Sequence, residues 1–366
     1  MNNPKLRFKA DDGNEFPEWK EKRLGDLFKI SAGGDIDKEN CSKSFSLKYP
    51  YPVYANALVN RGLYGYANYY KVQGDTFTVT GRGDVGYAVA RHGKYVPIVR
   101  LLVCEPKEND NVDFFAEQVN GVTIFVESTG VPQLTAPQLG KVKVKRPSLP
   151  EQRKIAAFLS TIDEIITTTE AELKAWEERK KGVMQKIFNR EVRFKADDGS
   201  EFPEWEEKKL GDVLSICHGK DYKHLSSGMY PVLGTGGVIT HVNSYLCNWE
   251  CALIGRKGTI DKPQYMDKPF WCVDTLFYTK PEKQQFPKWQ YYLFQIINWN
   301  KYNEASGVPS LSASTIENIL VDVPSLPEQK KIADCLSSLD DVINQIQAEL
   351  SAWKEFKKGL LQQMFV

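Results

Sequence analysis

The sequence predicts an α+β fold in which two mixed α/β domains are separated by two long antiparallel coiled-coil helices, with pseudo-two-fold symmetry. Three observations predict this fold: a long amphipathic segment that occurs twice, a lead-in segment that also occurs twice, and two unlike strand-rich segments between them. Internal repetition has to be established first, because a missed repeat leads to the wrong architecture.

The long amphipathic segment reads PSLPEQRKIAAFLSTIDEII at 147–166 and PSLPEQKKIADCLSSLDDVI at 324–343, with thirteen of twenty positions identical at an offset of 177. Apolar residues then recur at alternating steps of four and three over about four heptads, a pattern typical of a coiled-coil seam. Thr169 and Lys180 interrupt the first seam. Roughly 40 residues at about 1.5 Å per residue give a rod of about 60 Å, and we expect the two rods to pair.

Each long helix begins with a motif that predicts a capping box. Ser148 lies three residues before Glu151, and Ser325 three residues before Glu328. In such a box the serine oxygen accepts an unpaired backbone N–H, and the glutamate reaches back to the cap residue. The prolines at the next positions fit the first helical turn, where no N–H is needed.

The lead-in segment reads LRFKADDGNEFPEWKEKRLGDLFKI at 6–30 and VRFKADDGSEFPEWEEKKLGDVLSI at 192–216, with eighteen of twenty-five positions identical at an offset of 186. The chain is therefore two copies of one unit, and the first variable segment is nine residues longer than the second. If a two-fold axis relates the copies, the end of the second helix lies where the first lead-in begins. We therefore expect Asn3 and Phe365 to lie close together.

These repeats divide the chain into four parts, expected at 1–146, 147–189, 190–323 and 324–366: a strand-rich domain with its lead-in, a long helix, and the same pair again. β-branched and aromatic runs between turn residues predict strands, and two apolar patches predict helices near 112–119 and 289–297. The expected strands are Pro52–Tyr54, Thr76–Thr80, Tyr95–Val103, Tyr230–Leu233, Cys251–Ile254 and Thr275–Tyr278. A short helix and a strand then lead into each long helix.

Composition limits the class of protein. The net charge of +1 over 366 residues requires neither a nucleic-acid nor a membrane partner, and seven irregularly spaced cysteines indicate free thiols in a reducing compartment. The sequence has no run of 18 apolar residues, and its first residues lack the apolar stretch of a signal peptide, so we expect a cytoplasmic protein.

Catalytic and metal motifs are weak or missing. The sequence contains no phosphate-binding P-loop motif and no Asn-Pro-Pro-aromatic motif of amino-methyltransferases. Gly234 to Gly237 is interpreted as a turn rather than a cofactor loop. Cys247 and Cys251, with His218 and His241 nearby, could form a zinc set, but the loose spacing favours buried thiols. We expect no catalytic site and no metal site.

Two loops that place a cation between glycines are the candidate binding sites. They read Gly81-Arg82-Gly83 and Gly255-Arg256-Lys257-Gly258, and each follows a predicted strand. Glycine allows close approach of backbone to a phosphate, and arginine can address a phosphate or a guanine edge with two hydrogen bonds. An exposed hairpin tip is the alternative interpretation of each loop. The candidate DNA-binding residues are Arg82, Arg61, Asn60, Lys71, Arg91, Arg256, Lys257, Lys223, Lys262 and Gln264.

Charge does not decide between these interpretations. The first variable segment, 25–146, has 15 basic and 12 acidic residues, and the second, 211–323, has 10 of each. Strong nucleic-acid binders cluster lysine and arginine. If DNA is the ligand, we expect the chain alone to bind it weakly and partners to add contacts.

Four repeated features of the chain together resemble the specificity subunit of type I restriction–modification systems. They are the duplicated SLPEQ-K-IA helix start, the Tyr-Pro-Val strands at 51–53 and 230–232, the Gly-Arg loops, and the Gly-Val-Pro loops at 130–132 and 307–309. The resemblance covers essentially the whole chain, and the helix start is its most specific part. The near-identical copies of RFKADDG and FPEW depart from the usual pattern and suggest recent duplication or recombination.

The resemblance implies a non-catalytic subunit whose two domains each read one half of a bipartite, asymmetric site in double-stranded DNA. The helices would set the spacing between half-sites and dock two modification subunits, which bring the adenine methyltransferase and S-adenosylmethionine. A restriction subunit would add translocation and cleavage driven by ATP with Mg²⁺. No cofactor is then expected on this chain, and no membrane partner.

Two other functions stay open at this point. A coiled-coil adaptor whose inserts bind protein or glycan would fit the near-neutral inserts. An autonomous nuclease ranks last, because the sequence shows no persuasive constellation of carboxylates and lysine.

Overall fold

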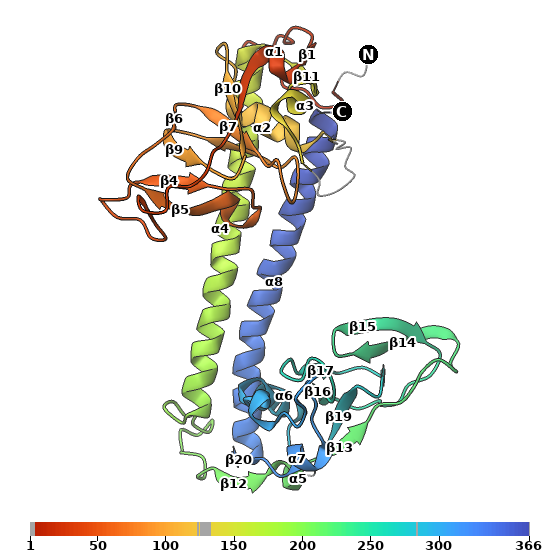
Figure 1. Ribbon diagram of the computed structural model, residues 1–366. Coiled ribbons are helices and arrows are strands. Elements are labelled where there is room, and N and C mark those ends of the chain that lie inside the picture. Colours follow the sequence, from red (N-terminus) through yellow and green to blue (C-terminus); the bar gives the residue numbers. More distant parts are fainter. Residues whose placement is uncertain (1–3, 123, 125–132, 283–284, 366) are drawn as a thin grey trace. The chain divides into compact units, whose positions relative to one another are not determined.

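The computed structural model describes residues 4–122, 124, 133–282 and 285–365 (Figure 1). The chain forms two compact units, each described here by itself. Unit 1 comprises Met1–Glu170 with Glu349–Val366, and unit 2 comprises Ala171–Ala348. Among the described residues, no helix is long and apolar enough to cross a membrane.

The two long helices are the predicted ones. Helix α4 spans Leu149–Phe188 and helix α8 spans Leu326–Met364, and each contributes one half to each unit. The other elements of unit 1 are β1 Lys20–Arg23, α1 Leu24–Leu27, β2 Phe28–Ala32, β3 Cys41–Ser42, β4 Tyr51–Tyr54, η1 Val59–Gly62, β5 Leu63–Ala67, β6 Val72–Gln73, β7 Thr76–Val79, β8 Ala88–Arg91, β9 Lys94–Pro97, β10 Leu102–Pro106, α2 Val112–Asn120, α3 Ala136–Gly140 and β11 Lys143–Arg146. Those of unit 2 are β12 Glu206–Lys209, α5 Leu210–Val213, β13 Leu214–His218, β14 Ser227–Gly234, β15 Gly237–Val242, β16 Cys251–Gly255, β17 Gln264–Met266, β18 Trp271–Cys272, β19 Leu276–Pro281, α6 Pro287–Ile296, η2 Trp299–Tyr302, α7 Ala313–Glu317 and β20 Leu320–Val323.

The two units share one topology. The four-stranded antiparallel sheet has the order β2-β10-β7-β8 in unit 1 and β13-β19-β16-β17 in unit 2. A second sheet contains β5-β4-β9 in unit 1 and β15-β14-β18 in unit 2, and in both cases the first pair is antiparallel and the second parallel. A two-stranded ribbon, β1-β11 or β12-β20, completes each unit. The common topology confirms the prediction that the chain is one unit built twice.

Strand register defines which residues of the two units are equivalent. Ile30 pairs with Cys104 as Ile216 pairs with Thr279, and Val103 pairs with Thr78 as Tyr278 pairs with Leu253. The difference in residue number between equivalent positions of the two units is thus 186 at β2, 179 at β4, 175 from β7 to α2, and 177 from residue 133 onward. The nine-residue length difference therefore lies in connections, and the strands themselves keep their register.

The apolar stripe of each long helix lies in the core of a mixed α/β domain as well as in a helix pair. In unit 1, Ile155 and Leu159 of α4 share one buried cluster with Phe77 of the sheet and with Leu360 and Met364 of α8. The corresponding cluster in unit 2 contains Ile332 and Leu336 of α8, Ala252 of the sheet, and Met184 and Ile187 of α4. Each domain therefore rests on both helices, which run antiparallel within each unit.

Equivalent lysine–aspartate pairs cross between the helices. The Nζ of Lys357 lies 2.7 Å from Asp163 in unit 1, and the Nζ of Lys180 lies 2.6 Å from Asp340 in unit 2. Lys180, which interrupts the predicted apolar seam, is thus an ion-pair partner between the helices. Lys357 also contacts Glu117 of α2 at 3.0 Å, whereas the equivalent position in unit 2, Tyr292, donates its hydroxyl to Asp340 at 2.7 Å.

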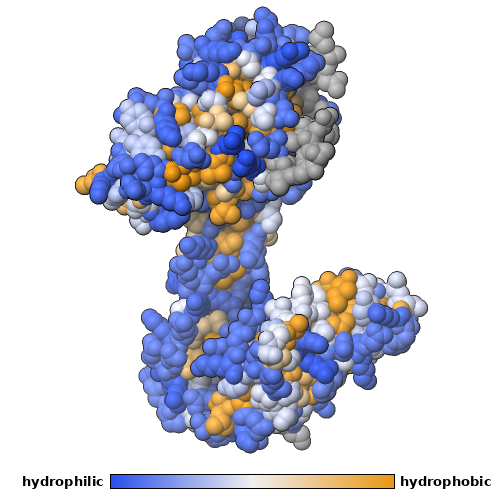
Figure 2. All heavy atoms as spheres, viewed as in Figure 1, coloured by the Kyte–Doolittle hydropathy of each residue, from blue (hydrophilic) through white to orange (hydrophobic). Residues whose placement is uncertain are grey.

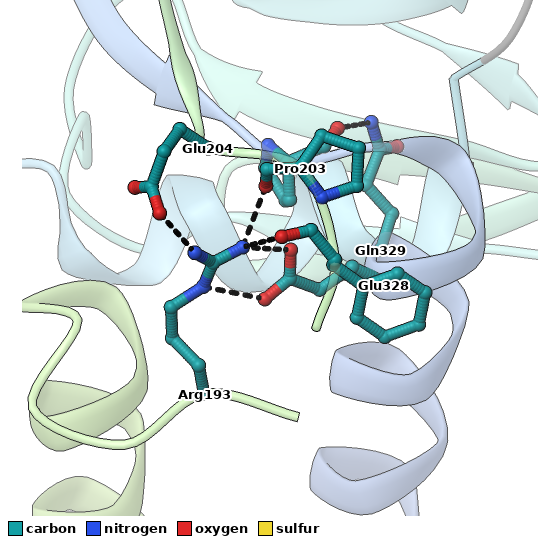
Figure 3. Close-up of polar contacts among 7 residues, drawn as sticks. Arg193, Pro203, Glu204, Glu328 and Gln329 are labelled. Carbon is teal, nitrogen blue, oxygen red and sulfur yellow. Dashed lines mark hydrogen bonds and ion pairs between the residues drawn. The ribbon is translucent and has the colours of Figure 1, made fainter. Parts of the chain in front are cut away.

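The predicted capping boxes are wrong. The hydroxyl oxygens of Ser148 and Ser325 are buried and find no hydrogen-bond partner in the part of the chain that the structure describes. The two glutamates, both completely buried, bind lead-in arginines instead: Arg7 contacts Glu151 at 3.0 and 2.9 Å, and Arg193 contacts Glu328 at 3.2 and 3.0 Å. Figure 3 shows the second of these pairs. A bidentate, charge-assisted contact with arginine is stronger than a hydrogen bond to one backbone N–H. The glutamate therefore binds the arginine and does not cap the start of its own helix.

The glutamine that follows each glutamate joins the start of the long helix to the mixed α/β domain. Gln152 accepts from the backbone N–H of Asn111, just before α2, and donates to the carbonyl of Pro147. Gln329 accepts from the N–H of Phe286, just before α6, and donates to the carbonyl of Pro324. The PEQ motif therefore joins three parts of each unit: its glutamate binds the lead-in arginine, and its glutamine binds the start of α2 or α6.

The chain ends meet in a turn that repeats the junction between the copies. The backbone N–H groups of Lys5 and Leu6 donate to the carbonyl of Gln363 at 2.9 and 3.2 Å. At the covalent junction, Glu191 and Val192 donate in the same way to Lys186 at 2.9 and 3.3 Å. The predicted closeness of the termini is thus confirmed at Lys5, while Asn3 lies outside the described residues.

Most predicted strands and both predicted domain helices are present, with one correction. The run Tyr95–Val103, expected as a single strand, is divided into β9 and β10. Val99 and Arg100 between them have φ values of +52° and +59°, a left-handed conformation that ends a strand. The break lets the chain pass from the second sheet into the first.

Candidate nucleic-acid interface

Two loops noted separately in the sequence are paired in each unit. In unit 1, Arg82 forms an antiparallel bridge with Gln133, and the N–H of Leu134 donates to the carbonyl of Gly81 at 2.9 Å. In unit 2, Lys257 forms the same bridge with Ser310, and the N–H of Leu311 donates to the backbone carbonyl of Arg256 at 2.9 Å. Residues 130–132 of the first Gly-Val-Pro loop lie outside the described residues.

This pairing corrects the alignment of the two Gly-Arg loops by one residue. Arg82 is equivalent to Lys257, and Gly83, with φ of +70°, is equivalent to Gly258, with φ of +92°. The shared feature is therefore an exposed cation followed by a glycine in the left-handed region, where a side chain would be strained. Arg256 is also exposed, and its guanidinium donates to the carbonyl of Asp274 at 3.3 Å.

A second loop of unit 1 lies beside this cation. Asn56 accepts from the N–H of Gly81 at 2.7 Å and donates to the carbonyl of Val99. Asn56 therefore joins the β4–β5 connection, the Gly-Arg loop and the β9–β10 corner. Arg100 at that corner is exposed. These three connections bring the cations Arg82 and Arg100 to the same part of unit 1.

The β4–β5 connection contains Asn60 and Arg61, both exposed and both left-handed, with φ of +50° at each. Such backbone costs free energy for residues other than glycine and is found where surrounding contacts enforce it. Gly62 closes the connection: its carbonyl accepts from the N–H of Ala55 at 2.9 Å. A side chain there would approach the carbonyl of Ala55 to 2.7 Å.

Arg91 differs from the other candidate residues, because its side chain is only 6% exposed. Its Nε donates to Thr78 Oγ1 at 3.1 Å, and its Nη2 donates to the carbonyl of Arg61. The guanidinium carbon lies 3.6 Å from the centre of the Tyr54 ring. Burial lowers the pKa of this arginine. Arg91 therefore lies beneath the Asn60–Arg61 connection and does not reach the surface for a contact with DNA.

In unit 2 the corresponding connection is short. Strands β14 and β15 are joined by a tight turn at Thr235 and Gly236, which confirms the interpretation of Gly234–Gly237 as a turn. Gln264 donates to the carbonyl of Gly234 at 2.9 Å, so this candidate residue supports the turn. Val238 and Ile239 are 58% and 52% exposed, and Figure 2 shows hydrophobic side chains over this hairpin.

Three further candidate cations, Lys71, Lys223 and Lys262, have exposed side chains. The structure joins none of them to the paired loops by a hydrogen bond among the described residues. Sequence reasoning missed Arg100, Gln133 and Ser310. The last two belong to the recurring Gly-Val-Pro loops, whose equal placement in both copies was the available signal, whereas nothing local marked Arg100.

Cys247 and Cys251 belong to an apolar interior, whereas His218 and His241 are exposed. The Sγ atoms of Cys247 and Cys251, both buried, lie 3.9 Å apart among Phe270, Cys272 and Leu253. His218 packs edge-on against Phe277. Within the described ranges, no group of three or more potential metal ligands is present.

Two mixed domains on paired helices, each with an exposed cation–glycine loop bridged to a second loop, make up the architecture of a DNA specificity protein. The family described as the type I restriction modification DNA specificity domain matches twice, at residues 17–176 and 203–352, and the chain belongs to this family.

Individual relatives agree with this assignment. The MjaVIII specificity subunit of Methanocaldococcus jannaschii is 26% identical over 282 residues, 64% of each chain. The present chain therefore matches just under two thirds of that relative's length. The MjaX specificity subunit of the same organism is 24% identical and aligns with 97% of this chain and 94% of its own. The crystal structure of the S subunit from M. genitalium matches all of this chain and 99% of its own, with a TM-score of 0.71 at 18% identity, which supports the fold.

Proposed function

We propose that this chain is the non-catalytic DNA-recognition subunit of a type I restriction–modification complex, in which each unit reads one half of a bipartite, asymmetric duplex site. The observation that carries the proposal is the pair of bridged loops, which place Arg82 and Lys257 at equivalent positions on a repeated frame. The neighbouring connections differ between the units. Equal placement with unlike surroundings is what two half-sites of different sequence require.

In this proposal, cations and amides of the connections contact phosphates and base edges. Arg82, Asn60, Arg61, Lys71, Arg256, Lys257, Lys223 and Lys262 are the exposed members of the candidate set. Gln264 supports the turn beside Lys257, and Arg91 supports the connection beside Arg82. The division at 1–146, 147–189, 190–323 and 324–366 then separates reading domains from spacing helices.

A repeated groove supports docking of two copies of one partner. In unit 1, a cavity of 790 Å³ is lined by Lys357, Lys358 and Leu361 of α8 together with Ile166 of α4. In unit 2, a cavity of 550 Å³ is lined by the equivalent Lys180, Lys181, Met184 and Ile343. We propose that modification subunits dock on these helix surfaces. They would bring S-adenosylmethionine and methylate an adenine extruded from the duplex, while a restriction subunit would use ATP and Mg²⁺.

The proposal is tested with the chain assembled with its modification subunits. Methylated adenines in host DNA define the target, and a duplex carrying that target is titrated at fixed salt. Arg82→Ala and Lys257→Ala are each expected to lower the affinity by about 1–3 kcal/mol, because each removes a charged contact to the duplex. Lys29→Ala, at an exposed position of β2 where the lysine pairs with Glu105, is the control.

Unchanged affinity in both variants would remove the bridged loops from the interface. If the assembled complex methylates no DNA and binds no duplex, the protein is instead an adaptor. Its apolar β14–β15 hairpin, where Met229 is 77% exposed, would then be the surface to examine for a protein or glycan partner.

A further inference from the structure

We infer that Arg91 is a positioning residue that holds the Asn60–Arg61 connection ready for DNA and so determines the specificity of unit 1 from beneath the surface. The inference rests on the proposed function. It assigns to Arg91 a role different from the direct DNA contact expected from the sequence.

The environment of Arg91 is unfavourable for a cation. The residue is 6% exposed, and no carboxylate among the described residues forms an ion pair with it. Its partners are a hydroxyl oxygen of Thr78, the carbonyl of Arg61 and the ring of Tyr54. A buried charge without an opposite charge costs folding free energy, so a residue of this kind needs a reason other than stability.

Unit 2 shows that the fold does not need this cation. By strand register, Arg91 is equivalent to Met266, since Arg91 pairs with Thr76 as Met266 pairs with Cys251. Thr78 is equivalent to Leu253 in the same way.

Register also makes Tyr54 equivalent to Leu233, and Tyr95 to Phe270. Leu233, Cys251, Leu253 and Phe270 form one buried apolar cluster, with Met266 packed against it. The same interior space is thus filled with apolar side chains in unit 2 and with polar ones in unit 1.

The polar interior accompanies the longer surface connection. In unit 1, residues 55–62 join β4 to β5, whereas in unit 2 only Thr235 and Gly236 lie between β14 and β15. Arg91 donates to the carbonyl of Arg61, one of two consecutive left-handed residues. Asn56 fixes the other end of this connection to the Gly-Arg loop. Arg91 therefore maintains a strained backbone that presents Asn60 and Arg61 to solvent.

The test replaces Arg91 with methionine, the residue that unit 2 has at the equivalent position, Met266. In the complex with modification subunits, Arg91→Met is expected to weaken binding of the target duplex about tenfold or more. Scrambling the half-site that unit 1 reads should then no longer affect binding, whereas scrambling the other half-site still should. Because the variant removes a buried unpaired charge, its thermal midpoint is expected to be unchanged or higher.

A triple variant, Tyr54→Leu with Thr78→Leu and Arg91→Met, gives Arg91 and its two side-chain partners the apolar residues that unit 2 has at these positions, and it controls for an isolated packing defect. It should fold and show the same selective loss. Lys29→Met, which removes a surface cation from the same unit, should leave affinity and half-site dependence unchanged.

Two results would overturn the inference. One is wild-type affinity and half-site dependence in Arg91→Met. The other is a lowered thermal midpoint with equal loss at both half-sites, which is what a merely structural residue would give. A wild-type complex that cannot distinguish the target duplex from a scrambled one overturns the proposed function, and the role of Arg91 with it.

Discussion

Unit 1 and unit 2 are alike in their frames and unlike in their interiors. Arg7 and Arg193 make matching contacts with Glu151 and Glu328, and each also donates to two carbonyls of its own lead-in. On the edge strands β8 and β17 the match ends, because Arg91 in unit 1 is replaced by Met266 in unit 2.

This difference teaches where sequence change is tolerated. The part that the two units share, which we call the frame, comprises the lead-in, the sheet and the start of the long helix. Charged groups hold it together, and both of its glutamates are completely buried. The sheet interior has to be filled, but it can be filled with polar or apolar groups. The comparison therefore predicts equal responses at frame positions and unequal responses wherever the units diverge.

The largest effect is expected at the frame arginines. Arg7→Ala and Arg193→Ala each leave a completely buried glutamate without its partner, which should cost about 3 kcal/mol of stability in the affected unit. Hydrogen exchange measured peptide by peptide would report each unit separately. Arg190→Ala, which breaks an exposed pair with Asp322, is the matched control and should cost under about 1 kcal/mol. A loss in only one unit would show that the two frames are not equivalent.

An intermediate effect is expected where the frame begins to diverge. Lys357→Met deprives both Asp163 and the half-buried Glu117 of a cation, whereas Lys180→Met deprives Asp340 alone, which keeps its bond from Tyr292. The first variant should therefore lose about 2–3 kcal/mol and the second about 1 kcal/mol. Chemical denaturation followed by hydrogen exchange would test the order, and equal losses would contradict it.

The smallest effect concerns a titratable group that only unit 1 has. His92 bridges Asp75 at 2.9 Å and Asp113 at 3.2 Å. Burial acts to lower the pKa of His92, but the two carboxylates outweigh it and raise the pKa above the usual 6.5. A raised pKa means that the contribution to stability is complete below the unfolded value and is lost as the pH rises through the folded value.

Unit 1 should therefore lose a small amount of stability between about pH 6.5 and the folded pKa of His92. His92→Asn should abolish this dependence and leave unit 2 unaffected. Nuclear magnetic resonance titration of the imidazole is the direct measurement, and a midpoint below 6.5 would contradict the expectation.

The sequence predicted the repeated parts well, because repetition doubled every signal. The long helices, the lead-ins, the common topology and the closeness of the chain ends all follow from segments that occur twice. The capping box failed, since Glu151 has the right spacing for a cap, but Arg7, which lies 144 residues away, takes it. A local pattern cannot reveal a competing partner that folding brings from elsewhere.

The candidate interface was predicted less completely. Exposed cations in loops were found by residue type, and the Gly-Arg loops were found by recurrence. The burial of Arg91 was not predictable, because a strand ending in arginine gives no sign of which face its last side chain occupies. The one-residue shift that equates Arg82 with Lys257 also needed the bridges to Gln133 and Ser310.

The confinement of all length differences to connections has a practical consequence for protein engineering. The second copy is shorter by seven residues between β2 and β4 and by four between β4 and β7, and it is longer by two before Ser310. Ile30 and Ile216 therefore mark one matched graft point, and Gln152 and Gln329 mark another. A segment cut at these points could be exchanged between the two copies, because both of its ends are at structurally equivalent positions. Hybrid chains can therefore be assembled without redesigning the long helices.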